Sequence, residues 1–285
     1  MQASAQPRPS DPIAVFDSGV GGLTVLHELL VSLPHEDFVY VGDTARFPYG
    51  DRSTAEVARF SLELSTLLLE RERAKLLVVA CNTATSVALH SLKGDLVAAG
   101  HDIEVIGVLA PESVLAVATT HNGRIGLLAT PTTVHTGAYA RAVASADPHV
   151  RLVSIPCPDL APLIQSGYLF DRRMVDTVRT YCAPLSAAGV DTVILGCTHY
   201  PLVAPMLQRT LGPRVELISS GHAVARRVEH ALAVAELQSP ADGEGDYRFL
   251  CTGEVEEFRE LGTRFLQMPL GEVAHIDLQT EVAAQ

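Results

Sequence analysis

Short apolar runs alternate with longer amphipathic ones along the first hundred residues of the chain. IAVFD, DFVYVGD and AKLLVVAC read as strands, whereas GGLTVLHELLVSL and TAEVARFSLELSTLLLERE carry a helical pattern. The strand runs are continuously apolar, as expected when both faces of a sheet are buried. This alternation predicts an α/β protein with a parallel sheet covered by helices.

The same alternation begins again in the second half. Strands are expected at EVIGVLA, RIGLLAT, VRLVSIPCPD and DTVILGC, with helices at PESVLAVATTH, TTVHTGAYARAVAS and RMVDTVRTYCAPLSAAG. Ile13 aligns with Ile125 and Cys81 with Cys197 at similar offsets. We interpret this match as a degenerate duplication. It predicts two similar parallel-sheet lobes related by a pseudo-twofold axis, with the active site in the cleft between them.

The expected organisation has three parts. Residues 1–11 are polar and Pro-rich and are expected to form a disordered tail. Residues 12–102 together with 216–276 are expected to form the first lobe, and residues 103–215 the second. The last residues of the chain carry no periodic pattern and are expected to be irregular.

Two cysteines occupy corresponding places in the two halves. Cys81 lies in VVACNTATS and Cys197 in VILGCTHYP, each after an apolar run and before an expected helix start. Ligands of open α/β sheets bind at the carboxyl ends of the strands. Two facing lobes would thus place one thiol on each side of a ligand. Such a pair suits proton removal from one face of a carbon and proton delivery to the other, as in a two-base racemase or epimerase.

Polar residues beside these cysteines complete the candidate site. Helix N-termini favour a thiolate and bind carboxylates, so Asn82, Thr83 and Thr198 are candidate substrate contacts. Asp17 and Ser18 in FDSGVGG are expected to point into the cleft, where Asp17 is suited to assist proton transfer. Further candidates are Tyr49 and Gly50 in GDTARFPYG, and His199, which follows Cys197 by two positions.

Several cysteines, His27 and the FDSGVGG turn have other interpretations. Cys157, Cys182 and Cys251 are interpreted as buried packing residues, and His27 as structural. A metal site of Cys81, Cys197 and His199 is disfavoured because residues on separate lobes lack chelating spacing. FDSGVGG is not followed by Lys-Ser/Thr, and Thr24 occupies the third glycine position of G-x-G-x-x-G, so a tight turn is favoured over a phosphate loop. The alternative role for Asp17 is capping of the following helix.

Charge, cysteine pattern and hydropathy argue against several classes of function. The formal net charge is −12 and no Lys/Arg cluster occurs, which disfavours nucleic acid as the main partner. The number of cysteines, five, is odd, which argues against a disulfide framework, and the absence of a C-x-x-C pair argues against a structural zinc site. No apolar run reaches the roughly 18 residues needed to span a membrane. With no signal-peptide pattern, the expected location is the cytoplasm.

Four motifs in order, AVFDSGVGGLTVL, YVGDTARFPYG, VVACNTATSVAL and LGCTHYPLV, closely resemble the glutamate racemases of the cofactor-independent aspartate/glutamate racemase superfamily. The resemblance runs from Ile13 to the VEEFRELGTRFL segment. It implies interconversion of L- and D-glutamate in a bacterial cytoplasm, supplying D-glutamate for peptidoglycan. It also implies that neither pyridoxal phosphate nor a metal is needed, and that the protein forms a homodimer.

The resemblance implies a role for each matching residue. Cys81 and Cys197 would be the acid/base thiols, assisted by Asp17 and His199 respectively. The implied substrate site comprises Asp17, Ser18, Tyr49, Gly50, Asn82, Thr83, Thr198 and His199.

Three positions depart from the family pattern. Gln165 stands where an assisting glutamate is usual, Glu112 where a glycine is common, and Ser219 where an aspartate is usual. Gln165 has no carboxylate to assist proton transfer, and we expect it to affect the rate or the balance between the two directions.

Two rival functions also fit the sequence. The same fold would suit another acidic amino acid, such as aspartate, because one sequence does not reveal side-chain length selectivity. Two lobes around a cleft also suit a solute-binding or regulatory protein. Binding alone does not require two thiols, so the cysteine pair favours the enzyme.

Overall fold

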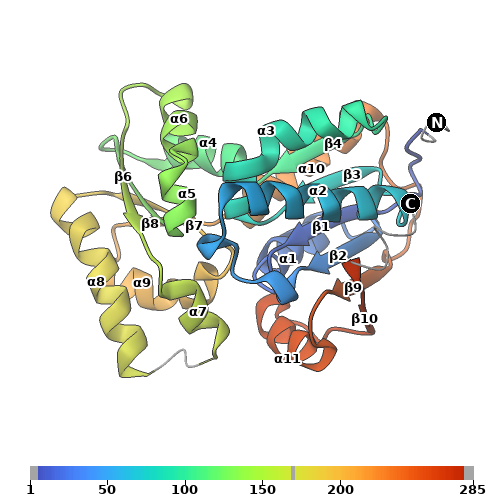
Figure 1. The fold of residues 1–285 in the computed structure, drawn as a ribbon. Helices are drawn as coiled ribbons and strands as arrows, with labels where there is room; N and C mark the ends of the chain where they lie inside the picture. Colours follow the sequence, from blue (N-terminus) through green and yellow to red (C-terminus); the bar gives the residue numbers. More distant parts are fainter. Residues whose placement is uncertain (1–5, 168–170, 279–285) are drawn as a thin grey trace.

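A computed structural model of the chain describes residues 6–167 and 171–278. It contains two parallel sheets, which lie side by side in Figure 1, the first at the right and the second at the left. The first sheet has the strand order β10-β9-β2-β1-β3-β4 and the second the order β6-β5-β7-β8. The strands are β1 (Ile13–Asp17), β2 (Phe38–Gly42), β3 (Leu76–Val79), β4 (Glu104–Gly107), β5 (Arg124–Ala129), β6 (Arg151–Pro156), β7 (Thr192–Gly196), β8 (Glu216–Ile218), β9 (Tyr247–Cys251) and β10 (Val273–His275).

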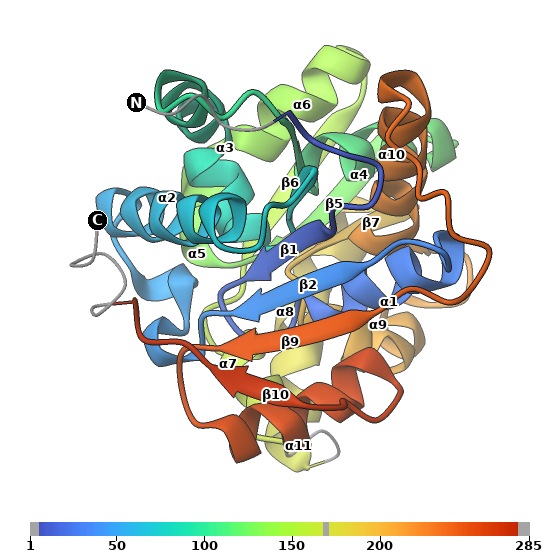
Figure 2. The same cartoon turned by 90° about the vertical axis from the view of Figure 1, so that its right-hand side faces the viewer.

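The strand orders confirm the expected two-lobe α/β architecture. The order β2-β1-β3-β4 in the first sheet repeats as β6-β5-β7-β8 in the second. The first sheet adds β9 and β10 beside β2, which Figure 2 shows as further parallel arrows. Cys81 follows β3 and Cys197 follows β7, so the two thiols leave equivalent strands.

Helices cover both faces of each sheet. In the first lobe α1, α10 and α11 pack on the face that carries Ile13 and Val15, and α2 and α3 on the face that carries Ala14 and Phe16. In the second lobe α8 and α9 cover one face, and α4 and α6 the other. The bounds are α1 (Leu23–Ser32), α2 (Thr54–Glu70), α3 (Asn82–Ala98), α4 (Leu109–Thr119), α5 (Pro131–His135), α6 (Ala138–Ala146), α7 (Leu160–Gln165), α8 (Arg172–Ala188), α9 (Ala204–Leu211), α10 (Ser220–Ala235) and α11 (Val255–Leu266).

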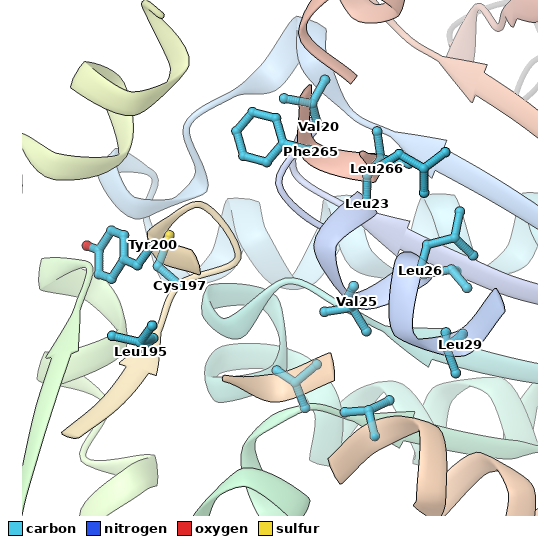
Figure 3. Close-up of a cluster of buried hydrophobic side chains, with 14 of the residues drawn as sticks. Val20, Leu23, Val25, Leu26, Leu29, Leu195, Cys197, Tyr200, Phe265 and Leu266 are labelled. Atoms are coloured by element: carbon cyan, nitrogen blue, oxygen red, sulfur yellow. The ribbon is translucent and has the colours of Figure 1, made fainter. Parts of the chain in front are cut away.

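One buried cluster runs between the lobes. Figure 3 shows Cys197 and Tyr200 on the turn that follows the strand carrying Leu195. Leu23 of α1 and Phe265 of α11 belong to the same cluster and are fully buried. The apolar core therefore reaches the turn that carries one thiol, which keeps that turn close to the first lobe.

The lobe boundaries differ from the expected ones at both crossings. β4 (Glu104–Gly107) pairs with β3 in the first sheet, although the second lobe was expected to begin at residue 103. β8 (Glu216–Ile218) pairs with β7 in the second sheet, although it was assigned to the first lobe. The physical reason is the duplication itself, because the repeat restarts at β5, the counterpart of β1. The strand before β5 therefore completes the first sheet.

Both chain ends are more ordered than expected within the described residues. Residues 6–11 form a turn in which Arg8 pairs with Asp11 at 3.0 Å, and the Pro9 carbonyl accepts a hydrogen bond from the buried Lys75. The expected disordered tail is therefore wrong for residues 6–11, while residues 1–5 lie outside the described residues. Near the other end, β10 adds a strand to the sheet where an irregular tail was expected to begin.

The long helix expected over residues 132–145 is broken into α5 and α6. Gly137 sits between them with a φ of 65°, a left-handed conformation that side chains with a Cβ disfavour. Within residues 6–167 and 171–278, none of the helices combines the length and apolar character required to cross a bilayer.

Candidate active site

Both thiols line one small cavity between the lobes. Cys81 is 4% exposed and Cys197 8% exposed, so each is nearly sealed from solvent. The cavity wall is built from Ser18, Phe47, Pro48, Tyr49, Gly50, Cys81, Asn82, Thr83, Thr130, Ala161, Cys197, Thr198 and His199. Every residue predicted from the sequence is among them except Asp17, which lies directly behind the wall.

Asp17 ends β1 and is fully buried beside the cavity. Its carboxylate accepts hydrogen bonds from the Gly19 N–H at 3.0 Å and from the Thr198 hydroxyl at 3.2 Å. The second bond joins the two lobes. Burial raises the pKa of Asp17 to about 6, and these hydrogen bonds offset only part of the rise. The N-cap of α1 is Gly22 rather than Asp17, so helix capping is not the main role of this carboxyl.

The glycines of FDSGVGG allow the lobes to approach. A Cβ atom on Gly21 would lie 2.4 Å from both His199 Nδ1 and Thr198 Oγ1, which no side chain tolerates. A Cβ on Gly22 would lie 2.5 Å from the Asp17 side chain. The turn is tight, as expected, and its close packing comes from the approach of the segments that carry Asp17 and Thr198.

Cys81 is the N-cap residue of α3. Its Sγ accepts a hydrogen bond from the Ala84 N–H at 3.4 Å and lies 3.7 Å from Ser18 Oγ. These contacts favour the thiolate as expected, but burial and then the Asp17 carboxylate raise the pKa of Cys81 to about 12. The expected lowering of the thiol pKa is therefore outweighed. In this closed state the proton stays on sulfur.

Cys197 has a different setting. It is followed by a 3₁₀ turn over Tyr200–Val203, and α9 begins only at Ala204, so the expected helix start directly after Cys197 is wrong. His199 Nδ1 lies 3.9 Å from its Sγ. Burial raises the pKa of Cys197 well above its usual value, and the charges that Asp17 and Cys81 would carry raise it further. The two thiols are thus near enough to influence one another.

His199 is a neutral base held in one tautomer. Its Nε2 lies 2.7 Å from Gln165 Oε1, an acceptor, so Nε2 carries the proton and Nδ1 is free to accept from Cys197. Burial lowers the pKa of His199 to about 3. The ring packs against Phe47 and Phe265, with centroids 5.3 and 5.0 Å away. Gln165 ends α7, a helix that the sequence patterns did not indicate.

Asn82 and Thr83 begin α3 and face the second lobe. Asn82 Nδ2 donates to the Tyr139 hydroxyl at 2.7 Å, while its Oδ1 is buried and lacks a hydrogen-bond partner among the described residues. The Thr83 hydroxyl lies 3.0 Å from that of Thr130 and 3.2 Å from that of Thr133. An unpaired carbonyl and a group of hydroxyls therefore gather at the cavity.

Tyr49 and Gly50 contribute in different ways. The Tyr49 hydroxyl donates to Asp43 at 2.5 Å, so this oxygen is already engaged and the rest of the residue lines the cavity. The Gly50 carbonyl accepts from Thr132 at 2.7 Å, and a Cβ on Gly50 would lie 2.9 Å from Thr130.

Sequence reasoning missed Thr130 as a cavity residue. In the alignment of Ile13 with Ile125, Thr130 corresponds to Ser18, which had been identified. The internal repeat thus contained the signal for this residue. Phe47 and Ala161 also line the cavity, and no sequence pattern pointed to them.

The remaining candidates have structural roles. Cys157, Cys182 and Cys251 are buried at 1% exposure or less, which fits their interpretation as packing residues. His27 Nδ1 lies 2.8 Å from the Leu266 carbonyl and ties α1 to α11. Within the part of the chain that the structure describes, no three His, Cys, Asp or Glu side chains are arranged to hold a metal ion.

Comparison with known proteins places the chain among racemases. A family model described as Asp/Glu/Hydantoin racemase matches residues 24–228. The chain is 42% identical to the glutamate racemase of Geobacter metallireducens over 96% of this chain and 99% of that protein. Among solved structures it matches a glutamate racemase isoform of Bacillus anthracis with a TM-score of 0.89 and 35% identity, over 95% of this chain and 99% of that one. A glutamate racemase of Francisella tularensis, solved with D-glutamate, matches with a TM-score of 0.88 and 29% identity over the same shares of both chains.

Proposed function

The chain belongs to the Asp/Glu/Hydantoin racemase family, and on that premise we propose that it interconverts L- and D-glutamate by proton transfer between two cysteines. The observation that carries the proposal is the single buried cavity lined by Cys81 and Cys197, which leave equivalent strands of the two lobes. Inversion at Cα requires a base on one face and an acid on the other, and this arrangement supplies both.

In the proposed reaction one thiolate removes the Cα proton and becomes a thiol. The electron pair left on Cα is shared with the adjacent carboxylate, and the opposite thiol donates its proton to the other face and becomes a thiolate. The product is the other enantiomer, and the two sulfurs have exchanged protonation states. Return to the starting form requires proton exchange with solvent or with neighbouring groups.

The neighbours of each sulfur suggest how its thiolate forms. The Cys81 thiol faces Ser18 Oγ, with the Asp17 carboxyl nearby, and the Cys197 thiol faces Nδ1 of His199, so each thiol has an acceptor at hand. Without substrate, burial keeps both protons on sulfur. The substrate ammonium would bring a positive charge between the thiols. Such a charge favours the thiolate and lowers the cost of ionisation.

The substrate carboxylates would meet the polar wall of the cavity. The hydroxyls of Thr83, Thr130 and Thr198 lie there, together with backbone N–H groups at the start of α3. These dipoles are suited to stabilise the negative charge that builds on the substrate when Cα loses its proton. The unpaired Asn82 carbonyl is suited to accept a hydrogen bond from the ammonium.

Access to the cavity would require the lobes to separate. Both sulfurs are almost fully buried, and the lobes meet through the Asp17–Thr198 hydrogen bond. Opening would admit glutamate, and closure would exclude water while Cα is deprotonated.

The wider role proposed for the protein follows from its relatives. D-glutamate made in the cytoplasm would supply peptidoglycan synthesis. A homodimer also remains a prediction that follows from the resemblance to the family.

Racemisation itself is the test of the proposal. Metal-free protein is incubated with L-glutamate without added cofactor, and the optical rotation is followed to equilibrium. L-aspartate is run in parallel, and the double variant Cys81→Ser, Cys197→Ser serves as the control. With the unmodified protein we expect the optical rotation of L-glutamate to decay to zero and that of L-aspartate to stay constant. We expect no decay with the double variant. Faster decay with aspartate would assign a different substrate, and inertness toward both would favour a binding protein.

A further inference from the structure

Glu112 is a carboxyl group in the interior without a charged partner. It lies in the first turn of α4 and is 0% exposed. Its Oε2 accepts hydrogen bonds from the Tyr139 hydroxyl and from Asn82 Nδ2, the latter at 3.3 Å. Its Oε1 is buried and forms no hydrogen bond of good geometry with the described residues. An isolated buried carboxylate is costly, so a carboxyl retained at this place calls for a physical role.

The position of Glu112 links three parts of the site. The chain passes from the first sheet to the second between β4 and α4, and returns between β8 and α10. Glu112 lies just after the first crossing, and the Ser220 side chain, at the second crossing, approaches its carboxyl. The third contact, Asn82, is the neighbour of Cys81 and lines the cavity. One side chain therefore touches both crossings and the wall of the cleft.

The surroundings favour the neutral form of this carboxyl. Burial raises the pKa of Glu112 to about 8, and its hydrogen bonds with Tyr139, Ser220 and Asn82 lower it only in part. The titratable groups nearby are the phenol of Tyr139 and, one contact further, the thiols of Cys81 and Cys197. Burial raises the pKa of all three above that of Glu112, so they are uncharged where Glu112 titrates.

We propose that Glu112 is a positioning residue which, as a neutral acid, holds Asn82 against the cleft and ties it to the two crossings between the lobes. The inference rests on the proposed function, because the ligand that Asn82 meets is taken to be glutamate. This substrate carries two carboxylates and one ammonium. A neutral Glu112 does not repel this substrate, whose net charge is negative. An ionised Glu112 would place a second negative charge beside Asn82, which is taken to contact the substrate.

The KM for glutamate as a function of pH tests this role. Wild type is compared with Glu112→Gln, which mimics the neutral acid with one acceptor and one donor, at every pH from 7 to 9. The ratio of the two KM values cancels the titration of the substrate ammonium and of the thiols. We expect the wild-type KM divided by the Glu112→Gln KM to be near one at pH 7 and to rise about tenfold by pH 9. The reason is that the neutral fraction of Glu112, with a pKa of about 8, falls about tenfold between these two pH values.

Two further variants separate positioning from packing. Glu112→Ala removes the contact to Asn82 and is expected to raise KM about fivefold or more at pH 7, with kcat within about twofold. Ser113→Ala, in the same turn of α4, removes a buried hydroxyl that has no hydrogen-bond partner among the described residues, and is expected to change neither constant. A KM ratio that stays constant up to pH 9, or an unchanged KM in Glu112→Ala, would overturn the proposal.

An infrared difference spectrum between wild type and Glu112→Gln keeps this test separate from the proposed function, since it needs no substrate. A protonated-carboxyl band should be present at pH 7 and disappear with a midpoint near pH 8. Absence of this band in an enzyme that racemises glutamate would overturn the inference alone. Its presence in a protein that does not racemise glutamate would support the neutral acid and count against the proposed function.

Discussion

Cys81 and Cys197 end equivalent strands of a duplicated fold, but the groups around them differ in charge. Cys81 lies beside the Asp17 carboxyl and accepts a hydrogen bond from the first turn of α3. Cys197 lies beside the neutral imidazole of His199 on a 3₁₀ turn, with no α-helix start directly behind it. The duplication thus fixes where the sulfurs are, and the unduplicated neighbours fix how each one ionises.

This difference bears on a reaction that is symmetric by thermodynamics. L- and D-glutamate have equal free energies in water, so kcat/KM must be the same in both directions. The two kcat values are free to differ, because each direction uses a different sulfur as the base. An asymmetric pair of neighbours is therefore compatible with the proposed reaction and predicts unequal kcat values.

The largest expected effect comes from removing one sulfur. Cys81→Ser or Cys197→Ser should each lower kcat by about 10³-fold or more in both directions, because every turnover needs both groups and a hydroxyl is a far weaker acid than a thiol. Optical rotation measures both directions. Cys182→Ala, which removes a buried sulfur on α8, should retain activity within about twofold. Substantial racemisation by either serine variant would contradict the two-base scheme.

The next effect concerns the carboxyl beside Cys81. Asp17→Asn should lower kcat by about 10²-fold, because the amide keeps the shape of the carboxyl beside that thiol but cannot take up a proton. The matched change beside Cys197 is His199→Asn. If the two neighbours serve different sulfurs, the two variants should alter the ratio of forward to reverse kcat in opposite senses. If both variants shifted this ratio in the same sense, the assignment of Asp17 to Cys81 and of His199 to Cys197 would be wrong.

Asp17 also predicts a stability difference with a defined sign. Its folded pKa, about 6, exceeds the ordinary value of 3.8, so the folded state binds the proton more tightly and loses stability as pH rises between these values. Relative to wild type, Asp17→Asn should therefore gain up to about 3 kcal/mol in unfolding free energy between pH 4 and pH 7. Urea unfolding of both proteins at the two pH values measures this gain, and an equal difference at both would contradict it.

A smaller effect is expected at Gln165. Gln165→Glu would place a carboxylate against Nε2 of His199, raise the pKa of the imidazole and alter the kcat of the two directions unequally by about threefold to tenfold. Gln238→Glu, an added charge at an exposed position, is the control. Kinetics that remain unchanged in both directions would show that the amide at this position is incidental.

The smallest effect is expected at Tyr49. Its hydroxyl already donates to Asp43, so Tyr49→Phe should change kcat and KM by no more than about twofold while costing about 1–2 kcal/mol of stability. Thermal unfolding and steady-state kinetics on the same preparation separate the two. A tenfold rise in KM with unchanged stability would instead assign the hydroxyl to substrate binding.

Sequence patterns predicted the fold because the central strands of both sheets are apolar on both faces, and the repetition of the strand pattern indicated two lobes. Cys81, Cys197 and most of the cavity wall followed, because strand ends gather at one edge of a parallel sheet. The lobe boundaries at β4 and β8 were predicted wrongly, because the sequence of an edge strand does not indicate which of the two sheets the strand joins.

Contacts between residues distant along the chain could not be predicted from the sequence either. The Gln165–His199 hydrogen bond depends on α7, a short helix without a periodic pattern. The thiol pKa values depend on how tightly the lobes close, and this burial outweighs the helix N-terminus that the sequence does reveal. The contacts of Glu112 with Asn82, Tyr139 and Ser220 join α4 to three other helices, through residues that are distant from Glu112 along the chain.

The central claim, that two sulfurs act on opposite faces of Cα, is tested most directly by early isotope exchange. L-glutamate with protium at Cα is incubated with the enzyme in D2O, and the reaction is stopped at a few per cent conversion. The two enantiomers are separated, and mass spectrometry measures deuterium in each. The account predicts D-glutamate that is almost fully deuterated and remaining L-glutamate that is almost free of deuterium. D-glutamate that retains the original protium would mean that one base carries the proton across, and would contradict the claim.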